Sequence, residues 1–84
     1  MDFNKWAEIF VTMMDKYGLR HITDLENGRF TIDEHFYIET NRHVRPYRCT
    51  LYEDGKEVCS SNPSGILLIA KEHVKKRRLK NVEC

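Results

Sequence analysis

Residues 47–58 read YRCTLYEDGKEV, and this stretch decides the fold. Its Asp54-Gly55 dipeptide accepts the positive φ angles of a two-residue turn, so the residues on either side predict a β-hairpin. In that register Leu51 opposes Val58, and alternation along the strands makes one face of the hairpin apolar. The apolar face carries Tyr47, Cys49, Leu51 and Val58. We expect this face to cover a hydrophobic core.

Further strands are predicted upstream of the hairpin, where apolar and polar residues alternate. The apolar positions are Phe30, Ile32, Phe36 and Ile38. Asn27-Gly28 is a second turn signal, and Asp33-Glu34 indicates a bulge or bend inside the alternating stretch. Residues 41–45 are expected to form the turn that leads into the hairpin. The prediction is one antiparallel sheet of three or four strands.

Two helices are predicted, one on each side of the strands in the sequence. In the first, residues 2–17, apolar side chains recur at steps of three and four, and Asp2 and Gly18 are suited to its two ends. These apolar residues are Phe3, Trp6, Ala7, Phe10, Met13, Met14 and Tyr17. The second helix begins near Ser61-Asn62-Pro63, because proline is tolerated in a first turn. One sector of it carries Ile66, Leu67, Ile69, Ala70, His73 and Val74.

The predicted fold class is therefore α+β, in the order α-β-β-β(-β)-α. Both helices are expected to cover the same face of the sheet, because each has one apolar side. We expect residues 1–80 to form a single domain and residues 81–84 a short tail. A chain of 84 residues builds only one core, with a net stability of about 3–5 kcal/mol.

Composition excludes several classes of protein. Hydrophobic residues make up 40% of the chain and charged residues 32%, which is outside the composition of disordered proteins. A net charge of +1 provides no general attraction to nucleic acid or to anionic lipid. The longest apolar run, residues 66–70, is far shorter than the ~20 residues of a spanning helix, so no membrane role is expected.

Cysteine usage indicates a reducing compartment. Cys49, Cys59 and Cys84 form an odd set without a C-x-x-C pair, and no apolar leader precedes them. The hairpin register places Cys49 and Cys59 on opposite faces, which argues against a disulfide between them. We expect a reduced, cytoplasmic protein.

Catalytic and metal-binding motifs are not evident in the sequence. The four histidines are scattered, the cysteines lack the short spacings of zinc sites, and no glycine-rich phosphate loop occurs. Each serine near the second helix is explained as a cap. We therefore expect a non-enzymatic protein with no cofactor and no metal.

The uncovered face of the sheet is the strongest candidate for recognition. By alternation it carries His35, Tyr37, Glu39, Arg48, Thr50, Tyr52 and Glu57. Tyrosine and arginine are common interface anchors, so we predict protein binding through Tyr37, Arg48 and Tyr52. Arg42 and Arg45 are expected to add a cationic patch at the edge. An ordinary solvated face, with tyrosines placed for cross-strand pairing, explains the same pattern equally well.

A basic block in the second helix is the alternative candidate. Its residues are Lys71, Lys75, Lys76, Arg78 and Lys80. They could contact nucleic acid, although cations near a helix C-terminus are also favoured by the helix dipole and need no ligand.

The order of elements, with YRCTLYEDGKEV as a hairpin and a basic final helix, resembles the double-stranded-RNA-binding domain. That family has a Lys-Lys-x-Ala-Lys cluster at the start of its final helix, where this chain has Ile66-Leu67-Leu68-Ile69-Ala70. Only Lys71 corresponds to the cluster, so the resemblance implies an architecture rather than RNA binding. The sequence predicts a small binding module, an adaptor, regulator or inhibitor of another protein or protein complex. By analogy of size, such proteins are carried by bacteriophages and mobile elements.

Overall fold

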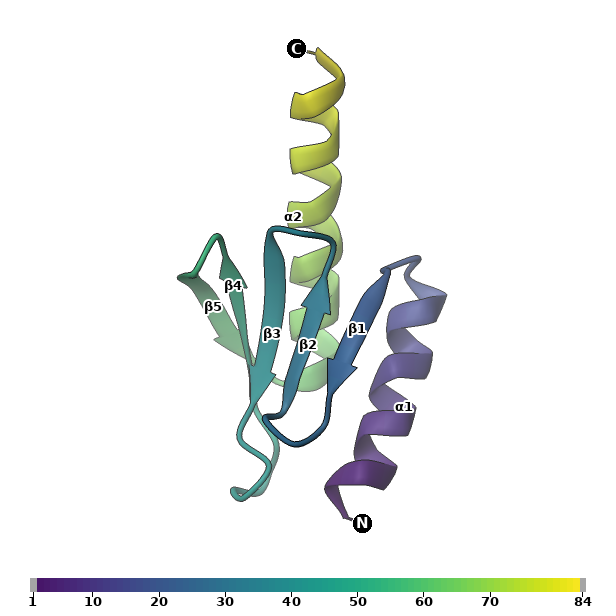
Figure 1. Cartoon of the computed structure of the whole chain (residues 1–84), viewed down its shortest axis with the longest axis vertical. Helices are drawn as coiled ribbons and strands as arrows, with labels where there is room; N and C mark the ends of the chain where they lie inside the picture. Colours follow the sequence, from purple (N-terminus) through teal and green to yellow (C-terminus); the bar gives the residue numbers. More distant parts are fainter. Residues whose placement is uncertain (1, 84) are drawn as a thin grey trace.

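The computed structural model of the chain consists of a five-stranded antiparallel sheet and two helices that cover one of its faces (Figure 1). The structure describes residues 2–83, and the side chains of residues 2–79. The elements are α1 (Phe3–Lys16), β1 (His21–Asp24), β2 (Arg29–Ile32), β3 (Phe36–Thr40), β4 (Cys49–Glu53), β5 (Lys56–Ser61) and α2 (Pro63–Glu83). The strands follow one another in the sheet in chain order. The predicted α+β class and order of elements are confirmed.

The sheet has five strands where three or four were predicted. The Asp33-Glu34 bend is a tight hairpin turn, with Asp33 at φ 53°, and it separates β2 from β3. Strand β1 was not predicted, because it lacks the alternation of apolar and polar residues that marks a half-buried strand. Its only large apolar residue, Ile22, is 76% exposed.

The helix ends follow the local signals. Asp2 Oδ1 accepts a hydrogen bond from the Lys5 amide at 2.8 Å, which caps α1. Gly18 ends the helix at φ 71°, where a residue without a Cβ is unstrained. At the start of α2, Asn62 Oδ1 accepts from the Gly65 amide at 2.7 Å. Helix α2 continues to Glu83.

The β4–β5 hairpin differs from the predicted register beyond its turn. Asp54 and Gly55 both have positive φ angles, as predicted. A bulge after Leu51 then shifts the pairing, so that Leu51 lies opposite Cys59 rather than Val58. The extra residue of a bulge reverses the expected facing of everything beyond it.

The prediction that Cys49 and Cys59 lie on opposite faces is therefore wrong. Cys49 is buried in the core, and Cys59 packs against the same core from the neighbouring strand. Both are free thiols.

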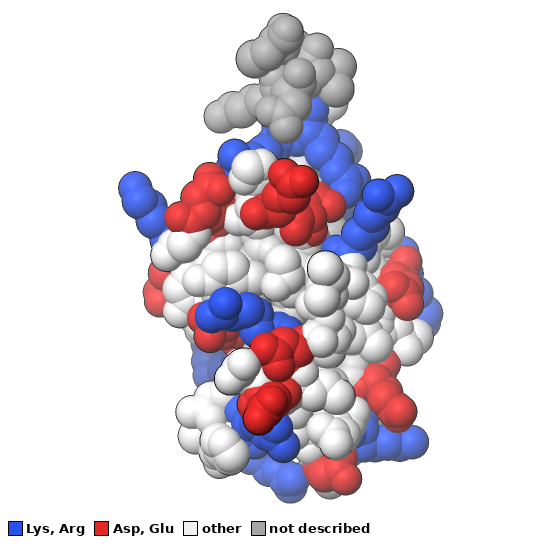
Figure 2. All heavy atoms as spheres, in the orientation of Figure 1, with Lys and Arg blue, Asp and Glu red and all other residues white. Residues whose placement is uncertain are grey.

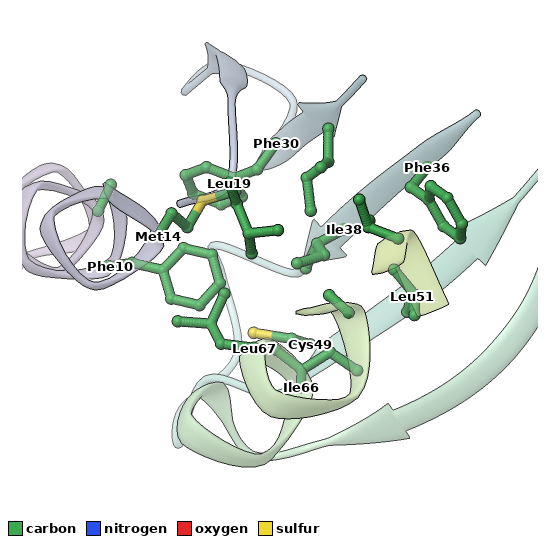
Figure 3. Close-up of a cluster of buried hydrophobic side chains, with 14 of the residues drawn as sticks. Phe10, Met14, Leu19, Phe30, Phe36, Ile38, Cys49, Leu51, Ile66 and Leu67 are labelled. Atoms are coloured by element: carbon green, nitrogen blue, oxygen red, sulfur yellow. The ribbon is translucent and has the colours of Figure 1, made fainter. Parts of the chain in front are cut away.

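The core lies between the two helices and one face of the sheet (Figure 3). Side chains of α1, α2 and the strands point into it, including Phe10, Met14, Phe30, Ile38, Leu51, Ile66 and Leu67. Ala70 and Val74 continue this buried side of α2, whereas Leu68 faces outward. The expectation that both helices cover one face of the sheet, with Ile66 and Val74 buried, is confirmed.

Candidate protein-binding surface

Two rows of side chains cross the face of the sheet that the helices leave uncovered. Strand pairing aligns one residue from each strand in each row. The tyrosine row consists of Ile22, Thr31, Tyr37, Tyr52 and Glu57. The polar row consists of Asp24, Arg29, Glu39, Thr50 and Ser60. The predicted recognition residues Tyr37 and Tyr52 are thus direct cross-strand neighbours.

The two tyrosines stack on each other at the centre of this face. Their ring centroids are 4.8 Å apart and their planes differ by 13°. The Arg29 guanidinium lies 4.5 Å from the Tyr37 ring centre, and its Nη2 is 3.6 Å from Glu39 Oε2. These contacts hold the rings in one orientation, so little side-chain entropy would be lost in a contact with another molecule.

Burial, and then the carboxylates of Glu39 and Glu57, raise the pKa of the Tyr52 phenol above its ordinary value, so the phenol is neutral at physiological pH. A neutral phenol both donates and accepts hydrogen bonds. The pair therefore offers an apolar ring surface with a polar rim.

A depression of about 560 Å³ continues from Tyr52 towards the loop between β3 and β4. Its lining is polar and of mixed charge, with Arg42 and Arg48 beside the carboxylates of Glu26 and Glu39. Arg48 is exposed and makes no ion pair with a described residue. The structure therefore brings the predicted residues Tyr52, Arg48 and Arg42 around one hollow.

The two other arginines of the loop are less available than expected. Arg42 Nη1 donates to the carbonyl oxygens of Leu25 at 3.0 Å and Glu26 at 3.4 Å, which ties the loop to the β1–β2 turn. Arg45 does not line the hollow, and its guanidinium lies 5.9 Å from the Tyr47 ring centre. Arg42 thus helps to shape the hollow, and Arg45 lies beside it.

The open face carries mixed charge. Figure 2 views the sheet from the side opposite α2, and it shows basic and acidic side chains interspersed with uncharged atoms across this face, its centre included. His35, which was also expected on this face, lies at its end, with Nδ1 3.0 Å from Asp54 Oδ1. Opposite charges occur side by side rather than in separate patches.

Sequence reasoning missed Arg29 and Ile22. Arg29 could have been found, because Phe30 points to the core and its neighbour must point away. Ile22 could not have been found, because β1 has only four residues and one large apolar side chain, and such a segment is equally compatible with a strand and with a loop.

Only some of the predicted basic residues of α2 share one surface. Arg78 Nη2 is 3.1 Å from Asp33 Oδ2, and Lys71 Nζ lies 5.6 Å from the Tyr17 ring centre. Lys75 shares a groove of about 280 Å³ with these two, whereas Lys76 is not among its lining residues. The side chain of Lys80 lies outside the described residues.

A charged network joins α2 to the turns of the sheet. Arg77 Nη1 donates to Glu53 Oε2 at 2.7 Å and to Asp54 Oδ2 at 2.9 Å. The hydrogen bond from Arg77, followed by that from His35, lowers the pKa of the Asp54 carboxyl. Arg77 therefore connects α2 to the β4–β5 hairpin.

The thiols are poorly suited to nucleophilic chemistry. Burial raises the pKa of Cys49 to about 11, and its Sγ lies 3.3 Å from Thr40 Oγ1. Burial also raises the pKa of Cys59. Because the thiolate is the reactive form, neither thiol is activated at neutral pH.

Among the residues that the structure describes, no group of three or more His, Cys, Asp or Glu side chains is arranged to hold a metal ion. None of the described helical segments has the length and apolarity needed to cross a membrane.

Comparisons with protein-family models, curated proteins and solved structures found no match.

Proposed function

We propose that the chain is a small, non-enzymatic protein-binding module, an adaptor, regulator or inhibitor that docks through the open face of its sheet. Tyr37 and Tyr52 would supply the central contact, and Arg48 a charged contact beside it. The single observation that supports this proposal is the stacked tyrosine pair, oriented by Arg29, on a face that both helices leave uncovered.

The chemistry of the face favours a protein partner over nucleic acid. Rigid aromatic rings and an available arginine are the side chains that most often dominate protein interfaces. Glu39 and Glu57 lie in the same two rows and would repel a phosphate backbone. At the end of the tyrosine row, Ile22 adds a 76% exposed apolar side chain.

The test is an affinity capture from the native host with identification by mass spectrometry, followed by measurement of the dissociation constant for each candidate partner. We expect Arg48→Glu and Tyr52→Ala to weaken binding at least roughly tenfold, which corresponds to about 1.4 kcal/mol. Lys76→Glu, on the outer side of α2, is the matched control and should leave affinity unchanged. Equal affinities for all these variants would refute docking through the sheet.

Nucleic-acid binding through α2 is the second candidate. It is favoured by Lys75 and Lys76, which are exposed and make no ion pair with a described residue. Gel-shift assays with duplex and single-stranded probes at two salt concentrations separate the candidates. Binding to phosphates through several cations weakens steeply with salt, whereas a mixed-charge protein interface does not.

A further inference from the structure

The outer side of α2 carries a stripe of four residues that no part of the described chain covers. Leu68, Glu72, Lys75 and Leu79 follow one another at steps of four, three and four, so they lie on one side of the helix. Both leucines are 54% exposed. The buried residues of α2, such as Ala70 and Val74, lie on the opposite side.

We propose that two copies of the chain associate through this stripe, with their α2 helices antiparallel about a two-fold axis near residues 73 and 74. Leu68 of each copy would then lie against the partner's Leu79. Glu72 would lie against the partner's Lys75. Every contact occurs twice, as a two-fold interface requires.

The order of charges selects the antiparallel arrangement. Two parallel helices in register would bring Glu72 against Glu72 and Lys75 against Lys75, which places like charges together. The antiparallel arrangement pairs opposite charges at the centre and apolar side chains at both ends. The spacing is that of alternating a and d positions in a coiled coil, where an antiparallel pair matches a with d.

The stripe is accessible to a second copy of the chain, and its small size limits the affinity of the proposed self-association. Figure 1 shows α2 behind the sheet and extending beyond it, and the exposure of Leu68 and Leu79 leaves its outer side accessible to a second helix. Four side chains per copy bury less than the roughly 1,200–2,000 Å² of stable complexes. On one flank Lys71 adds a repulsive cation, while Arg78 is partly neutralised by Asp33. We expect an association that is populated at high protein concentration.

Sedimentation velocity of the full chain, from about 20 μM to about 1 mM, tests the proposal. The wild-type average mass should rise towards that of two chains. Glu72→Lys and Lys75→Glu should each weaken self-association at least tenfold, because each creates two like-charge contacts. Mixed together, the two single variants should associate with each other, since two lysines at the centre of one stripe then face two glutamates at the centre of the other. The double exchange should restore self-association.

Control variants distinguish self-association through α2 from self-association through the open sheet face. Lys56→Glu, on β5, changes the net charge as Lys75→Glu does and should leave self-association unaltered. Circular dichroism verifies that the variants remain folded, since all are at exposed positions except the half-buried Tyr52. A wild-type mass that does not depend on concentration would overturn the proposal. So would single variants that associate like the wild type, a mixture that does not associate, or self-association abolished by Tyr52→Ala.

Discussion

The covered and open faces of the sheet are built from alternate residues of the same strands, yet different contacts hold their side chains. On the covered face Phe30, Ile38 and Leu51 are 0% exposed and meet side chains from both helices. On the open face Tyr37 and Tyr52 are held mainly by each other and by Arg29. Most apolar burial therefore belongs to one face.

This difference separates the residues that stabilise the fold from the surface that we propose for recognition. Burial of apolar area contributes about 25 cal/mol per Å², so substitutions on the covered face act on folding. Substitutions on the open face remove less burial and leave the core intact. The open face can in this way change in sequence without loss of the fold.

The largest expected effect comes from the covered face. Phe30 lies 4.8 Å from the Phe10 ring and 6.2 Å from that of Trp6, measured between centroids. Phe30→Ala should cost about 3–5 kcal/mol, which is comparable to the whole stability of about 3–5 kcal/mol expected at this size. Circular dichroism during urea titration should show a largely unfolded variant. Tyr37→Ala should stay folded, and equal losses from both would contradict the division between the faces.

A second comparison concerns two glycines at turns. A Cβ at Gly28, which has φ 66°, would overlap the carbonyl oxygen of Thr40, whereas one at Gly55, φ 83°, would meet nothing within 4 Å. We expect Gly55→Ala to cost about 1–2 kcal/mol for the backbone alone. Gly28→Ala should cost more, roughly 2–3 kcal/mol, because it adds the collision at the edge of the covered face. Urea midpoints measure both, and a larger loss at Gly55 would show that the close approach is unimportant.

The stacked tyrosines should have a smaller effect on folding. A double-mutant cycle with Tyr37→Ala and Tyr52→Ala should give a coupling free energy of about 0.5–1.5 kcal/mol. The free energy of unfolding of the wild type, both single variants and the double variant supplies it. Strict additivity would mean that the two rings are not held together in solution.

The smallest effect concerns the charged contact between α2 and the β4–β5 turn. Because Arg77 and His35 lower the pKa of Asp54 in the folded chain, the carboxylate stabilises the fold above its unfolded pKa of about 3.9. That contribution is lost as the pH falls through the lower folded pKa. Asp54→Asn should therefore reduce Tm at pH 7, and the difference from the wild type should shrink in strong acid. Asparagine also tolerates the positive φ of this position, so the turn itself is preserved. A Tm difference independent of pH would exclude the carboxylate as its cause.

Much of the fold could be predicted because its signals are local. Helix α1 has a capping aspartate, apolar residues on one side and a terminal glycine, all within 17 consecutive residues. The Asp54-Gly55 turn likewise depends on two adjacent residues. The extra strand and the bulge after Leu51 could not be predicted, because they depend on pairing between strands rather than on local preference.

The candidate site was predictable in composition and not in arrangement. Alternation along the strands assigned Tyr37 and Tyr52 to the open face. Their stacking, the position of Arg29 and the hollow beside Arg48 required the register of three strand pairs to be known.

What the sequence determined by itself is which residues of the helices and of β2, β3 and β4 turn inward and which turn outward, since the periods of helix and strand follow from backbone geometry. Only the tertiary structure decided which outward residues meet, such as Arg77 with Glu53 and Tyr37 with Tyr52. The physical reason is that contacts between distant segments depend on packing and register over the whole domain. A single bulge is enough to change them.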